Sequence, residues 1–296
     1  MFDEASQTHY HYADYKTIVS AKGGMNLYRG CTHGCIYCDT RSDCYQLAGD
    51  FEDIEVKSNA ARILDAQLSR KRKPHMISTG SMCDPYLPLE ATLEQTRACL
   101  EVIAHHDFGV SVLTKSTLAL RDIDLLTAIN NRSKVVVQTT FTTYDDELCR
   151  QLEPRVATTR QRADMLAAMH AAGISTVVWL GPFLPHINDD EDNLRGLLRL
   201  CDVAQVRAIL CFGFGMTLRA GSREHYYERL DQLFPGMADR YRVEFGDAYH
   251  VPSPRHARLM AILRDFCRSR DIIWRPDEVF AYLADFPNPQ QLSLFD

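Results

Sequence analysis

The sequence predicts an α/β protein, an open, partial (β/α)6 barrel with a C-terminal helical extension. Three observations support this fold class. Short apolar runs alternate with amphipathic stretches, a rhythm typical of repeated βα units. The rhythm changes to a helical pattern beyond Phe214. A length of 296 residues with 46% apolar residues is enough for one barrel with a sizeable core.

Six apolar runs are predicted to be strands, at residues 25–28, 75–79, 109–114, 134–139, 175–180 and 207–212. Helices are predicted between them. The first helix follows Ser58, and the second begins with a capping box formed by Thr92 and Gln95. The others cover residues 122–130, 160–172 and 192–204. Because reactive groups of such barrels gather at the carboxyl ends of the strands, we expect functional residues just after each strand.

The chain is predicted to divide into four parts. These are a polar N-terminal arm (1–24), the barrel (25–215), a C-terminal helical region (216–286) and a free tail (287–296). In the helical region, Ser253 is predicted as the N-cap of a long helix that starts with Pro254 and runs through Arg268. The tail shows neither a helix period nor a strand period, so no regular structure is predicted for it.

Charge and apolar patterning exclude some classes of protein. The formal net charge of -6 argues against a generally basic nucleic-acid coat, although it leaves room for a local basic patch. No apolar run approaches the roughly 18 residues of a membrane span, and the first residues are polar and acidic, unlike a signal peptide. We therefore expect a cytoplasmic protein with no membrane partner. Cysteines in such a chain are predicted to be thiols, metal ligands or core residues rather than disulfides.

Three cysteines follow the first predicted strand in a C-x3-C-x2-C spacing: Cys31, Cys35 and Cys38. A [4Fe–4S] cluster normally takes four cysteines, so this set leaves one iron open to an exogenous ligand. Gly30 and Gly34 permit the unusual backbone angles of a loop that wraps a cluster, and the ring of Tyr37 can cover it. The loop is therefore predicted to hold an iron–sulfur cluster with one open iron.

Two alternatives for this loop stay open. The first is a zinc site completed by Cys44 or His33, because zinc accepts four such ligands. A zinc knuckle usually pairs with a second half-site, however, and no other C-x2-C or H-x3-H spacing occurs in the sequence. In the second alternative Cys44 is a fourth cluster ligand, which would make the centre a simple electron carrier.

The cysteine loop, within NLYRGCTHGCIYCDTRSDCY, resembles that of the radical SAM superfamily. Three further segments are similar to its spore photoproduct lyase-like branch, also described as DNA repair photolyase-like: STGSMCDPYLPLE at 78–90, LTKSTLALRDIDLL at 113–126 and WLGPFLPHINDDEDN at 179–193. The resemblance covers roughly residue 26 to the end of the chain. It implies that the partial barrel is a radical SAM barrel.

The resemblance also implies two cofactors, a [4Fe–4S] cluster and S-adenosylmethionine (SAM) bound at the open iron, and an electron donor such as flavodoxin or ferredoxin. Reductive cleavage of SAM would give a 5′-deoxyadenosyl radical that abstracts hydrogen from the substrate. The leading prediction is an enzyme that repairs a DNA lesion, as a carbon–carbon lyase resembling spore photoproduct lyase. One alternative is radical chemistry on a protein or a small molecule. Another is a non-catalytic iron–sulfur or zinc module recruited to the sliding clamp.

Residues at the strand ends receive roles from the same resemblance. Ser81 is expected to contact the SAM amino group, Lys115 to neutralise a carboxylate, and Thr140 to bind the ribose or the carboxylate. In the alternative, each is an ordinary loop residue. Cys83 is either a hydrogen donor to the product radical, as a cysteine of the lyase is, or a structural thiol, because its offset departs from that of the lyase. Asp84 either orients SAM or substrate, or accepts local backbone hydrogen bonds.

The C-terminal residues predict contacts outside the barrel. Eight arginines there are candidates for phosphate contacts, although nearby acids such as Glu244 and Asp265 dilute that signal. They are Arg240, Arg242, Arg255, Arg258, Arg264, Arg268, Arg270 and Arg275. The tail resembles the bacterial sliding-clamp-binding peptide, with a glutamine amide and apolar anchors at Gln291, Leu292, Leu294 and Phe295. In the alternative, the tail folds back on its own domain.

Overall fold

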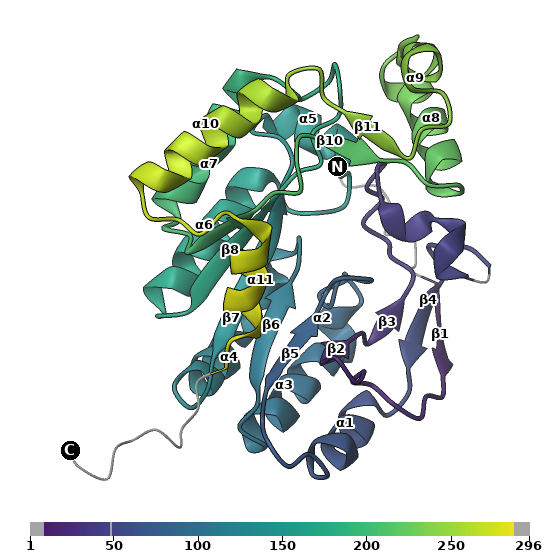
Figure 1. Cartoon of the computed structure of the whole chain (residues 1–296). Helices are drawn as coiled ribbons and strands as arrows, with labels where there is room; N and C mark the ends of the chain where they lie inside the picture. Colours follow the sequence, from purple (N-terminus) through teal and green to yellow (C-terminus); the bar gives the residue numbers. More distant parts are fainter. Residues whose placement is uncertain (1–8, 48, 287–296) are drawn as a thin grey trace, which may run out of the picture.

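A six-stranded parallel sheet forms the centre of the computed structural model, which describes residues 9–47 and 49–286 (Figure 1). Its strands are β2 (Gly24–Met25), β5 (Met76–Thr79), β6 (Gly109–Leu113), β7 (Val135–Phe141), β8 (Ser175–Leu180) and β9 (Ala208–Leu210). The strands lie in chain order, and every neighbouring pair is parallel. A sheet that always advances in one direction is a barrel wall. The predicted α/β fold is confirmed.

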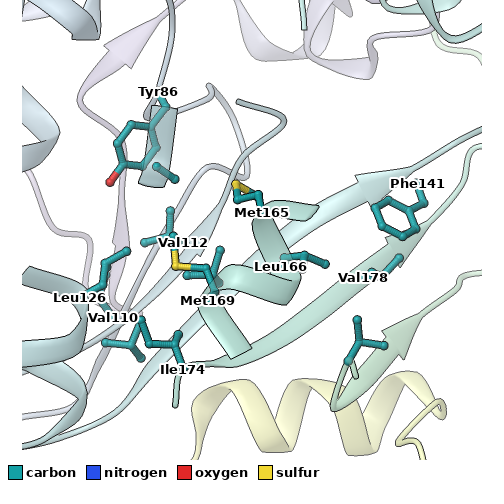
Figure 2. Close-up of a cluster of buried hydrophobic side chains, with 14 of the residues drawn as sticks. Tyr86, Val110, Val112, Leu126, Phe141, Met165, Leu166, Met169, Ile174 and Val178 are labelled. Carbon is teal, nitrogen blue, oxygen red and sulfur yellow. The ribbon is translucent and has the colours of Figure 1, made fainter. Parts of the chain in front are cut away.

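Helices cover the outer face of this sheet. They are α1 (Ala60–Leu68), α3 (Gln95–His105), α4 (Ile123–Asn130), α6 (Thr159–Ala171) and α7 (Glu191–Val203). Alternate strand residues such as Val110 and Val112 face these helices, because side chains along a strand point to opposite faces. Figure 2 shows Met165 and Met169 of α6 among these valines. Burial of this apolar layer holds the wall in place.

The inner face of the sheet is covered in part by the last helix. Residues that alternate with the outer set, among them Val136, Val177 and Leu210, pack against Val279 and Leu283 of α11 (Pro276–Ala284). In Figure 1, α11 stands in front of β7 and β8. The C-terminal helical region therefore lines the concave side of the barrel wall in addition to extending it.

The first predicted strand, at residues 25–28, is divided between two sheets. Its start is β2 in the barrel wall, whereas β3 (Tyr28–Arg29) joins a small sheet with β4 (Ile54–Lys57) and β1 (Tyr10–Ala13). At Leu27 the chain passes from one sheet to the other. The Leu27 carbonyl accepts a hydrogen bond from Lys57 N at 3.1 Å, which fixes this crossing. The predicted polar arm thus contributes a strand.

Two predicted caps are wrong. Thr92 lies inside α2 (Glu90–Leu93), and Glu94, at φ 50°, separates α2 from α3. The amide of Thr96 in α3 donates instead to the Glu90 carboxylate at 2.9 Å, so a buried side chain replaces the predicted capping box. Helix α10 (His256–Ser269) begins three residues after Ser253, whose hydroxyl donates to Asp189 at 2.6 Å.

The rest of the C-terminal region forms a small unit that packs against the cysteine loop. Strands β10 (Gly215–Thr217) and β11 (His250–Pro252) pair in antiparallel fashion, and α8 (Ser222–Leu233) and α9 (Met237–Phe245) lie between them in sequence. Their buried side chains form a cluster together with Ile36, Leu152 and Leu184, whereas α10 packs against α7. Among the described helices, none combines the length and apolarity that a membrane span requires.

Candidate functional site

Two adjoining cavities lie at the carboxyl ends of the barrel strands. The smaller, of about 150 Å³, is bordered by eight of the predicted site residues: Cys31, Cys35, Cys38, Ser81, Cys83, Asp84, Lys115 and Thr140. The larger, of about 590 Å³, shares four residues with the smaller one and adds Tyr37. The shared residues are Cys35, Cys38, Lys115 and Thr140. The structure therefore brings all nine predicted site residues to one place.

The cysteine loop is held by the connection between α5 (Asp146–Leu152), a helix that the sequence analysis did not predict, and α6. Ile36 N donates to Leu152 O at 3.0 Å, and Arg155 N donates to His33 O at 3.1 Å. Gly34 has a φ of +72°, and a Cβ there would lie 3.1 Å from the Pro154 ring. The close approach and the left-handed backbone together require glycine at this position.

The protein's own charges do not offset the burial of two thiols of this loop. Burial, aided by repulsion from neighbouring cysteines, raises the pKa of Cys31 well above its ordinary value. Burial also raises the pKa of Cys35 to about 12. Only thiolates bind metal, and the positive charge of a metal centre is what stabilises them. Three cysteines around one cavity fit a cluster that takes three protein ligands.

The zinc alternative finds no support in the side-chain geometry. Within residues 9–47 and 49–286, no group of three or more His, Cys, Asp or Glu side chains converges on a position for one metal ion. A cubane cluster does not need such convergence, because its cysteines bind different irons. Cys44 is exposed, borders neither cavity, and accepts a hydrogen bond from Arg219 Nη1 at 3.2 Å. His33 does border the smaller cavity, 3.6 Å from Asp84.

A buried network of polar side chains lies behind the loop; we name it the cysteine-loop network, formed by Tyr37, Lys115, Glu153 and Arg162. Lys115 Nζ lies 3.5 Å from Cys35 Sγ, 3.0 Å from Tyr37 Oη and 3.2 Å from Glu153 Oε1. Glu153 also accepts short hydrogen bonds from Tyr37 and Arg162. Glu153 and Arg162 are both fully buried. The sequence analysis missed both residues.

Charge within this network is mutually stabilised. Burial opposes the ionisation of Glu153, but Arg162 and Lys115 outweigh it and hold the pKa of Glu153 well below its ordinary value. Burial likewise lowers the pKa of Lys115, but Cys35, Tyr37 and Glu153 outweigh it and raise that pKa well above its ordinary value. The network therefore carries a fixed carboxylate and two fixed cations next to the cysteine loop.

The loop after β5 borders the smaller cavity and contacts the start of the cysteine loop. The Cys83 thiol is buried and donates a hydrogen bond to the carbonyl of Gly30 at 2.8 Å. The Asp84 carboxylate accepts three hydrogen bonds, from Tyr86 N at 2.8 Å, Thr114 Oγ1 at 2.7 Å and Lys115 N at 2.8 Å. Asp84 thus ties the ends of two strands together at the edge of the cavity.

The larger cavity has a mainly apolar and aromatic wall that the sequence analysis did not identify. Trp179 and Phe212 come from the ends of β8 and β9, and Met216, His250 and His256 come from the β10–β11 ribbon and the start of α10. Phe212 is 70% exposed, with its ring 6.0 Å from that of Trp179. This wall leaves room for a second molecule beside the cysteine loop.

The arginines predicted to touch phosphates are mostly paired with acids. Seven of the eight form ion pairs within 4 Å: Arg240, Arg242, Arg255, Arg258, Arg264, Arg270 and Arg275. An exposed arginine paired with a carboxylate offers little net positive charge to a phosphate. The predicted clamp-binding tail lies outside the described residues.

The fold and the cysteine loop define a radical SAM protein. The family model described as Radical SAM superfamily matches residues 25–198, which is more than half of the chain, and the chain belongs to this family. Its cofactors are therefore a [4Fe–4S] cluster and SAM.

Individual relatives add detail. An uncharacterized protein of Mycobacterium tuberculosis is 29% identical over 234 residues, covering 77% of this chain and 68% of the relative. The radical SAM Nalpha-GlyT isomerase of Pseudomonas phage M6 is 25% identical over 182 residues, covering 62% of this chain and 37% of the isomerase. A variant of spore photoproduct lyase has a TM-score of 0.61 at 13% identity, covering 84% of this chain and 74% of the lyase. This last likeness shows the fold alone.

Proposed function

We propose that this chain is a radical SAM enzyme that acts on a nucleic acid and repairs a DNA lesion in a lyase-like reaction. The observation that carries the proposal is the pair of adjoining cavities, one bordered by the three cysteines and the other large enough for a further ligand. A lyase of the same fold has been solved with dinucleoside spore photoproduct. That likeness makes a damaged nucleobase the first substrate to test.

The smaller cavity would hold the cofactors, and the larger cavity would hold the substrate. Cys31, Cys35 and Cys38 hold the cluster, and Ser81 and Thr140 offer hydroxyls to SAM at the strand ends. When bound, these cofactors supply a 5′-deoxyadenosyl radical that removes a hydrogen atom from the substrate. The aromatic wall of the larger cavity would contact the substrate beside SAM.

Cys83 is the candidate hydrogen donor of this reaction. Its thiol borders the smaller cavity and lies 2.8 Å from Gly30 O, a distance that suits a protonated thiol. Burial raises the pKa of the Cys83 thiol well above its ordinary value, so the proton stays at neutral pH. Cys83→Ala should cleave SAM but release altered product. Cys83→Ser keeps the hydrogen bond, but its hydroxyl is a poorer hydrogen-atom donor than a thiol, so this variant should behave like Cys83→Ala. Normal product from both variants would mean that Cys83 is structural.

Anaerobic reconstitution tests the proposed enzyme class. About four irons per chain with reductive cleavage of SAM are expected. Tightly bound zinc without SAM cleavage would instead indicate a non-catalytic module. Deuterium transfer from lesion-bearing oligonucleotides into 5′-deoxyadenosine tests the substrate directly. Failure with every oligonucleotide would favour a protein or small-molecule substrate, an alternative that the pairing of the C-terminal arginines with acids supports.

The proposed partners are an electron donor, such as flavodoxin or ferredoxin, and the bacterial sliding clamp. A peptide spanning residues 289–296 should bind the clamp with roughly micromolar affinity, worth about 8 kcal/mol. Replacement of Leu294 and Phe295 by alanine should abolish binding. If calorimetry detects no binding by the peptide or by the whole protein, the clamp is removed from the proposal.

A further inference from the structure

We propose that Glu153 and Arg162 are positioning residues that hold the Lys115 ammonium on the Cys35 sulfur and thereby raise the reduction potential of the cluster. This inference rests on the proposed function, because it assumes a cluster on the cysteine loop. It assigns Lys115 a role different from the SAM-carboxylate partner that the sequence predicts. The two roles make different measurable predictions.

The contacts of Lys115 favour the cysteine. A lysine ammonium has three hydrogens to donate. Three acceptors surround Nζ, namely Cys35 Sγ at 3.5 Å, Tyr37 Oη at 3.0 Å and Glu153 Oε1 at 3.2 Å. The donors of this side chain are therefore matched by the protein itself. A carboxylate of SAM would have to displace one of these partners.

A charged donor on a ligand sulfur has a defined electronic consequence. Reduction adds negative charge to an iron–sulfur cluster, and hydrogen bonds to its sulfurs are one of the factors that set its potential. A cation that donates to Cys35 stabilises the reduced cluster more than the oxidised one. Lys115 at 3.5 Å should therefore make the cluster easier to reduce.

The buried pair fixes where this cation lies. Oε1 of Glu153 faces Lys115, Tyr37 and the Thr142 hydroxyl, which is 3.3 Å away, whereas Oε2 faces Arg162. Arg162 balances the carboxylate, so Glu153 can stay charged without contact with solvent. Without this carboxylate the flexible lysine stem would have other rotamers available.

The pair is poorly explained by stability alone. A buried ion pair contributes little net stability compared with apolar side chains of similar volume. In the described part of the chain, Nε and Nη1 of Arg162 are buried without a hydrogen-bond partner, which costs further free energy. Such an arrangement next to a ligand cysteine is better explained by the placement of Lys115 than by the strength of the fold.

The test compares midpoint potentials of the reconstituted protein, measured by redox titration with electron paramagnetic resonance. Lys115→Met removes the charged donor and should lower the potential. The double variant Glu153→Gln with Arg162→Met removes the pair without changing net charge, and replacing both partners limits the damage to folding. It should lower the potential by a similar shift. Adding Lys115→Met to it should cause no further shift, because one interaction cannot be lost twice.

Control variants distinguish a specific change of cluster potential from a general loss of folding. Glu90→Gln with Arg121→Met removes another ion pair of a buried glutamate, at 3.0 Å, that borders neither cavity, and should leave the potential unchanged. If the Glu153 and Arg162 variant does not fold, Glu153→Asp retains the charge but withdraws the carboxylate from Lys115, and should also lower the potential. Thermal unfolding of the cluster-free protein reports folding independently of the cluster.

Three results would overturn the inference. Additive shifts in the triple variant would mean that the pair and Lys115 act independently. An unchanged potential in Lys115→Met with weakened SAM binding would assign Lys115 to the SAM carboxylate. An unchanged potential in a folded Glu153→Asp variant would remove the positioning role. None of these touches the proposed function, which fails if the wild-type protein binds no cluster, does not cleave SAM, or transfers no deuterium from any lesion-bearing oligonucleotide.

Discussion

Two networks in this barrel combine tyrosine and arginine with buried carboxylates, yet they contact different groups at their ends. The cysteine-loop network ends on Cys35. The second, which we name the α3 network, is formed by Tyr28, Tyr86, Glu90, Arg97, Arg121 and Asp122 and joins α2 and α3 to the segment 117–122. Both contain tyrosine hydroxyls on buried carboxylates balanced by arginine. What each network holds in place differs.

Solvent access separates the two networks as well. Arg97 and Arg121 are 27% and 21% exposed, whereas Arg162 is fully buried. The α3 network accepts a backbone hydrogen bond from Thr96 at the start of α3, so its task is to fix a helix start. The role of an ion network therefore depends on the groups that it contacts at its ends and not on its residue types.

The largest effect should come from removing the group on which the cysteine-loop network ends. Cys35→Ala, and equally Cys31→Ala or Cys38→Ala, should abolish the iron content of reconstituted protein, because each thiolate holds one iron. Cys44→Ala is the matched control and should keep its iron, since Cys44 is exposed and borders neither cavity. Loss of iron from the Cys44 variant would mean that Cys44 is a fourth cluster ligand, which would leave no iron open to SAM.

The next effect concerns stability. Arg162→Ala leaves Glu153 charged and fully buried with only Lys115 as a cation, and should cost about 3–5 kcal/mol of unfolding free energy. Arg97→Ala should cost less, because solvent reaches this site and Arg121 still pairs with Asp122 at 2.8 Å. Urea unfolding of the cluster-free variants measures both. Equal costs would remove the distinction between the networks.

The two buried glutamates should also respond to acid in opposite ways. The pKa of Glu153 is held below its ordinary value of roughly 4.3 despite burial, because Arg162 and Lys115 are close. Its stabilising contribution is present above about pH 4.3 and is lost as the pH falls toward its folded-state pKa. Burial raises the pKa of Glu90, although Tyr28 and Arg121 oppose the shift. Its ionisation therefore costs stability as the pH rises from about 4.3 through its folded-state pKa.

Urea unfolding between about pH 3 and pH 7 tests this contrast. The stability lost in Glu153→Gln relative to wild type should grow as the pH rises through the acid range. The stability lost in Glu90→Gln should shrink over the same range. Parallel curves for the two variants would show that the carboxylates have similar environments.

The smallest effect should come from single hydroxyl groups. Tyr86→Phe removes a hydrogen bond of 3.0 Å to Asp122 and should cost about 1 kcal/mol without moving the cluster potential. Tyr37→Phe removes one of the three partners of Lys115 and should lower that potential slightly. A changed cluster potential in the Tyr86 variant would mean that the α3 network also acts on the cluster. An unchanged potential in the Tyr37 variant would mean that Tyr37 does not help to place Lys115.

Much of the fold could be predicted from local patterns. The run at 175–180 matches β8, and the helix predicted at 160–172 is displaced by one residue from α6. Each of these signals lies within a single segment, where strand and helix periods are encoded. The division of residues 25–28 between two sheets could not be predicted in this way, because it depends on β4, which lies some 30 residues further along the chain.

For the site, too, local sequence signals could be predicted and contacts between distant segments could not. The cysteine spacing and the residues at the strand ends are local, and the structure gathers all nine of them around two cavities. Glu153 carries no local signal. Arg162 carries a weak one, because it lies three and four residues before Met165 and Leu166 on the apolar face of α6.

The sequence by itself therefore determined the class of fold, the cysteines predicted to hold the cluster and the candidate residues at the strand ends. Only the tertiary structure decided what Lys115 contacts. Its ammonium and the Cys35 sulfur belong to residues 80 positions apart, and Glu153 and Arg162 reach them only when α6 has docked on the outer face of the sheet. Spacing and periodicity are properties of one segment, whereas the pairing of buried charges depends on how distant segments pack.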